Sequence, residues 1–207
     1  QHALGALRFR LGAKRGALVL SRGDLTQWSG SAIVNAANER MLGGGGVDGA
    51  IHRAAGPQLL DECRRVPEVR PDVRCPTGEA RLTRAYGNLK VEHIIHTVGP
   101  IYRAPRDWGA LGEPRGVNTG GSSSESATLL ESCYRNCLRI ANEERLKTLA
   151  FPAISCGIYH YPLDDAAEVA LEAVRAHAGS LEEVHFVLFG EDTFSAWEKA
   201  ARAMNLV

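Results

Sequence analysis

The chain has 207 residues, of which 44% are hydrophobic and 23% charged, and its formal net charge is zero. This balance excludes the strongly basic class of nucleic-acid binders, so nucleic acid is not an expected partner. The longest apolar runs, such as VHFVLF at residues 184–189, are too short to cross a bilayer, and no membrane association is predicted. The length suits one α/β domain, residues 1–207, with a full hydrophobic core.

Strand-like and helix-like segments alternate along the chain. Strands are predicted at residues 17–21, 32–35, 79–86, 93–99, 148–155 and 184–189. Helices are predicted at residues 47–65, with a break near Pro57, and at 127–144, 163–177 and 191–204. This alternation predicts an α/β fold with a largely parallel sheet between helices. In such sheets ligands bind beyond the carboxyl ends of the strands.

Two segments interrupt this alternation. Residues 103–126 are rich in Gly, Ser, Pro and Arg and are predicted to form a long surface loop insertion. A shorter loop is expected at residues 66–78. No internal repeat is visible, so a single domain remains the simplest organisation.

The five cysteines are an odd number without C-x-x-C spacing, which indicates reduced thiols. Cys133 and Cys137 fall one helical turn apart in an apolar stripe and are predicted to be small buried hydrophobes. The first sixteen residues show no signal-peptide pattern. We therefore expect an intracellular protein, cytoplasmic or nuclear, with an organelle left open.

The stretch NAANERMLGGGGVDGAIH, residues 35–52, holds four consecutive glycines. Gly44, Gly46 and Gly49 match G-x-G-x-x-G, but the seven residues AANERML separate the glycine run from the preceding strand, and no acidic residue follows a second strand. A Rossmann-type oxidoreductase is therefore disfavoured. The glycines form either a flexible turn or an anion site. Glycines at a helix start leave backbone N–H groups free for phosphate.

A second turn of this kind, SCGIYHYP at residues 155–162, also lies between a strand and a helix. Two such turns suit a diphosphate held from both sides. Four stretches now identify a family: GDLTQWSGSAIVNAANERMLGGGGVDGAIHRAAGP, CPTGEARLTRAY, VEHIIHTVGPIY and LAFPAISCGIYHYP. Together they resemble a macrodomain of the MacroD type, from about residue 17 to the end of the chain.

The resemblance implies a three-layer α/β/α fold, ADP-ribose binding, and hydrolysis of mono-ADP-ribose esters on acidic side chains, with deacetylation of O-acetyl-ADP-ribose. It implies ADP-ribose and mono-ADP-ribosylated proteins as partners, no cofactor, and a monomer. A reader that binds ADP-ribose without turnover and an ADP-ribose 1″-phosphate phosphatase stay open as alternatives. The retention of both Asn38 and Asp48 favours the hydrolase.

Residue roles follow from the matched positions. Asp24 is expected to accept a hydrogen bond from the adenine amino group, and Leu25 to supply backbone contact. Phe189 is expected either to pack on the adenine or to lie in the core. The backbone groups that hold the diphosphate are expected from both turns: Gly44, Gly45, Gly46, Val47, Ser155, Cys156, Gly157 and Ile158. Tyr159 resembles the family aromatic beside the distal ribose.

The reacting end is assigned to three residues. Asn38 resembles the residue that hydrogen-bonds the distal ribose, and Asp48 the catalytic acid that orients a water. Asp48 is expected to stay ionised at a helix N-terminus. His52, four residues further on, either acts in catalysis, by orienting Asp48 or touching substrate, or makes a structural hydrogen bond. Asn35 is expected to brace the loop.

Metal and covalent chemistry are not predicted. Asp48 and His52 supply two ligands, and a catalytic zinc needs about three. Cys156 at a helix start has the position of an activated thiol, but the implied mechanism uses water. Cys156 and His160 stand where many relatives have Thr and Gly, and His160 either faces solvent or crowds the ribose end. The loop at 103–126 is a candidate lid or protein contact.

Overall fold

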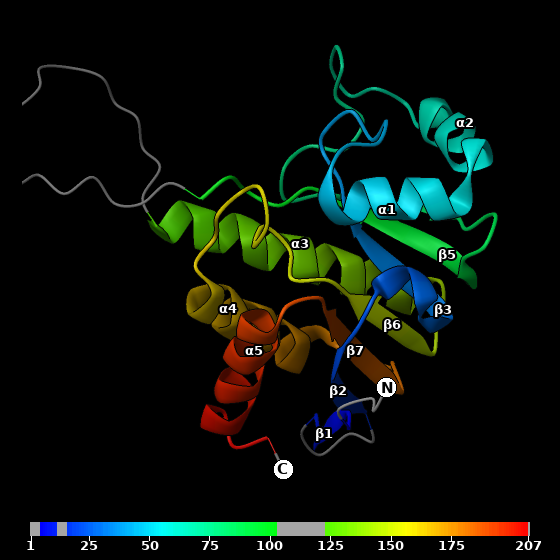
Figure 1. Cartoon of the computed structure of the whole chain (residues 1–207). Helices are drawn as coiled ribbons and strands as arrows, with labels where there is room; N and C mark the ends of the chain where they lie inside the picture. Colours follow the sequence, from blue (N-terminus) through cyan, green and yellow to red (C-terminus); the bar gives the residue numbers. More distant parts are fainter. Residues whose placement is uncertain (1–4, 12–15, 103–122, 207) are drawn as a thin grey trace, which may run out of the picture.

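The computed structural model describes residues 5–11, 16–102 and 123–206 (Figure 1). Within these ranges seven strands form one mixed sheet in the order β1-β2-β7-β6-β3-β5-β4. The strands are β1 (Leu7–Arg10), β2 (Ala17–Arg22), β3 (Ser29–Ala36), β4 (Ala80–Arg84), β5 (Lys90–Thr97), β6 (Thr148–Phe151) and β7 (Glu183–Leu188). The five inner strands pair in parallel, and β1 and β4 pair antiparallel at the edges.

The helical elements are η1 (Leu25–Gln27), α1 (Gly46–Ala55), α2 (Pro57–Arg65), α3 (Ser123–Glu143), α4 (Leu163–His177) and α5 (Glu191–Ala203). The break expected near Pro57 is confirmed. Gly56 ends α1 with a φ of 76°, a left-handed conformation that favours glycine. Pro57 then occupies the first turn of α2, where its missing N–H costs no helical hydrogen bond.

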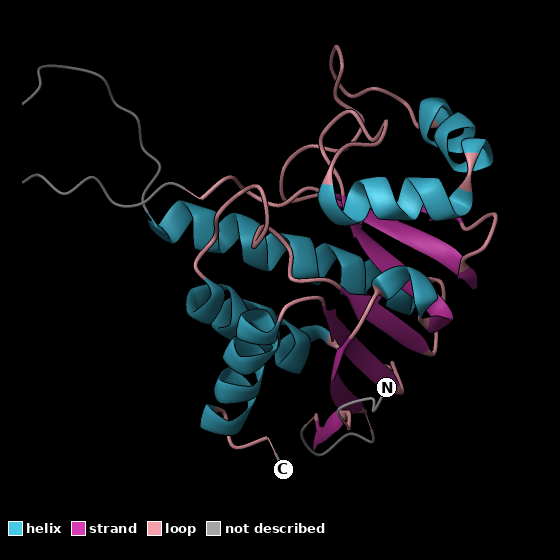
Figure 2. Ribbon diagram, in the orientation of Figure 1, coloured by secondary structure: helices cyan, strands magenta, loops and turns pink. Residues whose placement is uncertain are grey.

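Helices cover both faces of the sheet (Figure 2), and each face carries its own core. Alternate residues of one strand enter different cores because side chains of a strand alternate between faces. In β3, Val34 packs with α3, α4 and α5 while its neighbour Ile33 packs with α1 and α2. The predicted three-layer α/β/α arrangement, with a largely parallel sheet, is confirmed.

Several element boundaries differ from the sequence predictions. The edge strand β1 was not predicted, and β6 ends at Phe151 rather than at residue 155. Pro152 follows β6, and a proline cannot donate to the hydrogen-bond ladder. Helix α3 begins at Ser123, so the last four residues of the predicted loop 103–126 are helical. Residues 103–122 of that loop lie outside the described residues.

Among the helices of the described residues, none combines the length and the apolar character that a membrane span requires.

Candidate active site at the carboxyl edge of the sheet

A cleft of about 300 Å³ opens beyond the carboxyl ends of β3, β5 and β6, where α1 begins. We call it the glycine cleft. Two turns form its sides: the glycine turn, residues 43–46, and the second turn, residues 153–159. The lining residues are Ala36, Ala37, Asn38, Gly44, Gly45, Gly46, Val47, Asp48, Gly99, Ala153, Ser155, Gly157, Ile158 and Tyr159. The structure thus brings together most of the residues expected at a diphosphate and distal ribose.

The two turns approach each other closely across the cleft. A Cβ atom added at Gly45 would lie 3.2 Å from Cδ1 of Ile158, whereas one added at Gly157 would meet no atom within 4 Å. A side chain at residue 157 would therefore project into open space on the cleft wall. Gly45 is also the N-cap of α1, and no side chain caps this helix. The first-turn N–H groups of α1 are thus available to an anion.

Asp48 lies in the first turn of α1 and is only 3% exposed. Asn35 Nδ2 donates to its Oδ1 at 2.7 Å, and His52 Nε2 lies 3.5 Å from the same oxygen. The other oxygen, Oδ2, has no hydrogen-bond partner among the described residues. A buried carboxylate oxygen without a partner is costly, and this one belongs to a residue that lines the cleft. Asp48 is therefore placed to accept a proton or a hydrogen bond from a ligand or a water.

Burial raises the pKa of Asp48, and this effect outweighs the hydrogen bond from Asn35 and the proximity of His52, which both lower it. The helix N-terminus alone favours an acidic carboxyl, so desolvation dominates here. The raised pKa makes the Asp48 carboxylate a stronger base than an exposed aspartate.

Gly44 explains how Asp48 and Asn38 can share one position in the cleft. A Cβ atom at residue 44 would lie 3.0 Å from Asp48 Oδ2 and 3.1 Å from Asn38 Nδ2. Asn38 holds the turn itself, because its Nδ2 donates to the Gly43 carbonyl at 3.0 Å and its Oδ1 accepts from the Arg40 N–H at 3.1 Å. A larger residue at position 44 would push the two functional side chains apart.

Behind Asp48 lies a buried series of hydrogen-bonded side chains that the sequence analysis did not predict. Asn35 Nδ2 also lies 3.1 Å from Nδ1 of His96, and His96 Nε2 lies 2.9 Å from Oγ1 of Thr83. Because an amide NH₂ only donates, His96 Nδ1 accepts, and Nε2 carries the proton that is donated to Thr83. Burial lowers the pKa of His96 to about 3, so this histidine is neutral. Asn35 thus braces the carboxylate as well as the loop.

His52 is half-buried, and its ring lies on the other side of the glycine turn. It lines a separate, shallow cavity of about 440 Å³ that Leu42, Gly43, Arg53 and Leu60 share, and it is absent from the wall of the glycine cleft. Its Nε2 has no hydrogen-bond partner among the described residues apart from the 3.5 Å approach to Asp48. This position fits a residue that orients Asp48 rather than one that touches substrate.

The second turn is held mainly by main chain. The Tyr161 N–H donates to the Ser155 carbonyl at 3.0 Å, and Ser155 has a φ of 65°. Cys156 differs from the expectation for this turn, since its N–H donates to the Ala153 carbonyl at 3.3 Å and the residue does not line the cleft. Its thiol packs toward the core, and burial raises its pKa to about 12, which disfavours a thiolate nucleophile.

Two further residues resolve alternatives that the sequence left open. Phe189 is 89% exposed, so core packing is wrong for this side chain. It follows β7, directly beside Gly23, whose N–H donates to the Leu188 carbonyl. His160 is exposed, with a φ of 53°, a conformation that suits the glycine of many relatives, and it does not line the cleft.

Asp24 and Leu25 stand at the far end of the same sheet edge, after β2. Asp24 is exposed and caps η1, because its Oδ1 accepts from the N–H and the Oγ1 of Thr26 at 2.9 and 2.8 Å. Leu25 is buried. The cap uses Oδ1 of Asp24 and leaves Oδ2 outside the hydrogen bonds of that turn.

Across the described ranges, no group of three or more His, Cys, Asp or Glu side chains is arranged to hold a metal ion.

The fold and the cleft agree with comparisons to known proteins. A sequence model of the family described as "Macro domain" matches residues 34–170, more than half of the chain. The chain therefore belongs to the Macro domain family. It is 47% identical, over 86% of its length and 92% of the relative, to a macro domain-containing protein of Xanthomonas campestris. It is 45% identical to the O-acetyl-ADP-ribose deacetylase of Salmonella typhimurium, over 85% and 89% of the two chains.

Solved structures agree over the same range. An Oceanobacillus iheyensis macrodomain with ADP superposes with a TM-score of 0.83 at 34% identity, over 99% of this chain and 98% of that one. A Trypanosoma brucei macrodomain in complex with ADP-ribose has a TM-score of 0.70 at 39% identity, over 89% of this chain and 68% of that one.

Proposed function

We propose that this chain is a mono-ADP-ribosyl hydrolase that binds ADP-ribose, cleaves its esters with protein aspartate and glutamate, and deacetylates O-acetyl-ADP-ribose. In this proposal its partners are ADP-ribose and mono-ADP-ribosylated proteins, and it acts as a monomer without a metal. The choice of ligand is supported by similar proteins. The similar structures include complexes with ADP and with ADP-ribose, and one similar protein is an O-acetyl-ADP-ribose deacetylase.

The binding half of the proposal rests on the order of sites along the sheet edge. Asp24 and Phe189 follow the adjacent strands β2 and β7, while the two glycine-bearing turns follow β6 and β3. An adenine at the first pair would place a diphosphate between the turns, where the uncapped first turn of α1 offers N–H groups. The distal ribose would then reach Asn38, Asp48 and Tyr159, which share the cleft wall.

The observation that carries the catalytic half is the unpartnered Oδ2 of Asp48. In the proposed reaction this oxygen accepts a hydrogen bond from a water and directs it at the ester carbonyl or the anomeric carbon. The water oxygen forms the new bond and gives its proton to Asp48 or to a ligand phosphate. When the carbonyl is attacked, its bond to the ribose oxygen breaks and that oxygen takes the proton back. When the anomeric carbon is attacked, its bond to the ester oxygen breaks and the carboxylate leaves. The products are free ADP-ribose and the carboxylic acid.

Two alternatives use the same cleft. A reader that only binds the nucleotide gains nothing from a buried carboxylate beside an anion, and the burial of Asp48 costs free energy. The geometry of Asp48 therefore favours turnover. A phosphatase acting on ADP-ribose 1″-phosphate needs the same residues, and only a comparison of substrates separates the two activities.

The test is a release assay on acceptors with defined Glu, Asp, Ser and Arg linkages, together with O-acetyl-ADP-ribose and ADP-ribose 1″-phosphate. Asp48→Ala and Asn38→Ala are expected to lower ester hydrolysis by about 10² or more, while calorimetry still detects ADP-ribose binding by Asp48→Ala. Binding without any release by the wild type would instead establish a reader. Release from the phosphate alone would establish the phosphatase.

A further inference from the structure

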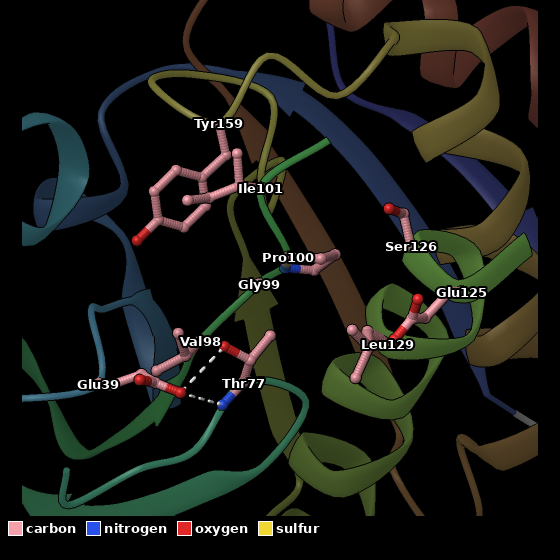
Figure 3. A pocket seen from close by; sticks show the side chains of 10 residues that line it. All are labelled: Glu39, Thr77, Val98, Gly99, Pro100, Ile101, Glu125, Ser126, Leu129 and Tyr159. Carbon is pink, nitrogen blue, oxygen red and sulfur yellow. Dashed lines mark hydrogen bonds between the residues drawn. The ribbon is translucent and has the colours of Figure 1, made fainter. Parts of the chain in front are cut away.

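A second cavity adjoins the glycine cleft at its reacting end. It has a volume of about 410 Å³ and shares Gly99 and Tyr159 with the glycine cleft. Its other lining residues are Glu39, Thr77, Val98, Pro100, Ile101, Glu125, Ser126 and Leu129 (Figure 3). We call it the acceptor cavity. Its volume lies within the range of about 300–1,000 Å³ that is usual for ligand pockets.

The position of this cavity continues the order of sites along the sheet edge. The proposed adenine site follows β2 and β7, and the two turns follow β6 and β3. Val98, Pro100 and Ile101 follow β5, the next strand in the sheet. A nucleotide that enters at β2 and presents its distal ribose at β3 therefore has the acceptor cavity directly beyond that ribose.

The acceptor cavity is lined by two glutamates, Glu39 and Glu125, among mostly apolar residues. In Figure 3 the α3 residues Glu125, Ser126 and Leu129 form one side, and Glu39, Val98 and Tyr159 form the other. None of the ten lining residues is Lys, Arg or His. Ile101 is 59% exposed, so the cavity rim offers an apolar surface beside two carboxylates.

Glu39 is held firmly in this wall. Its Oε1 accepts from the N–H and the Oγ1 of Thr77 at 3.0 and 3.2 Å. Arg70, which does not line the cavity, lies 3.3 Å from the same oxygen and 3.5 Å from Oε2. Oε2 of Glu39 is therefore contacted only by Arg70, at 3.5 Å, among the described residues. Arg70 forms an ion pair with Glu39 that offsets part of its charge, while Oε2 retains capacity to accept a further donor.

Tyr159 lines both the glycine cleft and the acceptor cavity. Burial raises the pKa of its hydroxyl, and the negative charges of Glu39 and Asp48 raise it further. Because Tyr159 lines both cavities, it stands at the boundary between the cleft that holds Asp48 and the wall that holds Glu39.

We propose that the acceptor cavity binds the peptide segment flanking the ADP-ribosylated side chain, with a preference for a lysine or arginine next to the modified residue. This inference rests on the proposed function, because only a chain that accepts modified proteins has such a segment to bind. The ester leaving group must depart from the distal ribose on the side away from the diphosphate, and the acceptor cavity lies on that side. Glu39 and Glu125 attract a basic neighbour and repel an acidic one.

The test uses three substrates. Two are peptides of identical sequence, ADP-ribosylated on one glutamate, with either lysines or glutamates on both sides of it. The third is O-acetyl-ADP-ribose, whose two-carbon acyl group carries no flanking peptide. The wild type is expected to prefer the lysine-flanked peptide in kcat/KM by about three- to ten-fold at low salt, with the preference weakening as salt rises.

The variant Glu39→Gln/Glu125→Gln removes both charges and keeps an acceptor oxygen for Thr77. It is expected to abolish the preference between the peptides while leaving kcat/KM for O-acetyl-ADP-ribose unchanged. The matched control is Glu144→Gln, which neutralises an exposed glutamate just after α3 outside the cavity, and it is expected to retain the preference.

The outcomes separate the two proposals. Equal kcat/KM for both peptides in the wild type, or a preference that survives in Glu39→Gln/Glu125→Gln, overturns the acceptor cavity while hydrolysis of O-acetyl-ADP-ribose upholds the hydrolase. If no ester is cleaved although ADP-ribose binds, the hydrolase is overturned. The Kd values of the two peptides then decide the question of the cavity, with the same expected preference and the same variant.

Discussion

The two turns that face each other across the glycine cleft are built in opposite ways. The glycine turn is held by side chains: Asn38 donates to the Gly43 carbonyl at 3.0 Å, and just after the turn the buried Asp48 accepts from Asn35 at 2.7 Å. The second turn is held by main-chain hydrogen bonds and by Cys156 packing into the core. One turn therefore fixes chemical groups, and the other fixes a backbone shape. Substitutions in the two turns should accordingly affect different quantities.

The largest effect is expected from Gly157→Glu in the second turn. A side chain here meets no protein atom within 4 Å and enters the space proposed for the diphosphate with a negative charge. ADP-ribose affinity should fall by at least about 100-fold, or about 2.7 kcal/mol, with little change in thermal stability. Calorimetry measures the affinity. Gly157→Gln has nearly the same volume without the charge and separates repulsion from bulk. Unchanged affinity in Gly157→Glu would contradict the placement of the diphosphate.

A smaller effect is expected from Thr83→Val, which tests the support of the glycine turn. The substitution removes the nearer partner of His96 Nε2 and leaves this buried donor only the weak contact with Cys63 Sγ at 4.0 Å. It thereby loosens the hydrogen-bonded side chains that lead through Asn35 to Asp48. We expect kcat for O-acetyl-ADP-ribose to fall by about ten-fold with KM unchanged. Thr97→Val is the control, because Thr97 is equally buried but donates to the Glu79 carbonyl instead. A Thr83→Val enzyme with no greater loss of kcat than Thr97→Val would show that the chain only stabilises the fold.

The smallest effect is expected on stability, from Asp48→Asn. Burial raises the folded-state pKa of Asp48 above its unfolded value, so wild-type stability falls as pH rises from the unfolded pKa through the folded one. The asparagine still accepts from Asn35 and carries no buried charge. Near neutral pH it should raise the free energy of unfolding by about 1 kcal/mol, although hydrolysis should fall as in Asp48→Ala.

Urea unfolding of wild type and Asp48→Asn across the acid range measures this difference, which should vanish at low pH. Asp61→Asn provides the control, because that aspartate is 60% exposed and its neutralisation should shift stability little. A variant less stable than wild type at neutral pH would mean that the charge of Asp48 is well solvated or paired.

The inner sheet and its helices were predictable because local patterns encode them. A short apolar run predicts a strand such as β7, and an apolar stripe at helical spacing predicts α3. The edge strand β1 was not predictable, because LRFR at residues 7–10 alternates over only four residues. Its strand character depends on pairing with β2, which no local pattern reveals.

The site divides in the same way. Gly44, Gly45 and Asp48 could be placed together at a helix start because they stand in one continuous motif, while their functional roles stay predictions. His96 could not be separated by sequence from His93, which stands three residues earlier in the same strand. What distinguishes His96 is contact with Asn35, 61 residues away in the chain. Long-range contacts of this kind depend on sheet pairing, and the roles of Asp24, Phe189 and His52 stay predictions.

Asn35 and His96 are also direct partners in the register of β3 and β5. The anchor of the Asp48 carboxylate is therefore assembled when these two central strands pair, before any nucleotide arrives. A slip of one residue in either strand would turn that strand's side chain to the opposite face and separate Asn35 from His96. Little reorganisation energy is then needed around Asp48 when a ligand enters. A chain that recovered its helices but mispaired these two strands would lose the hydrogen bond that positions Asp48.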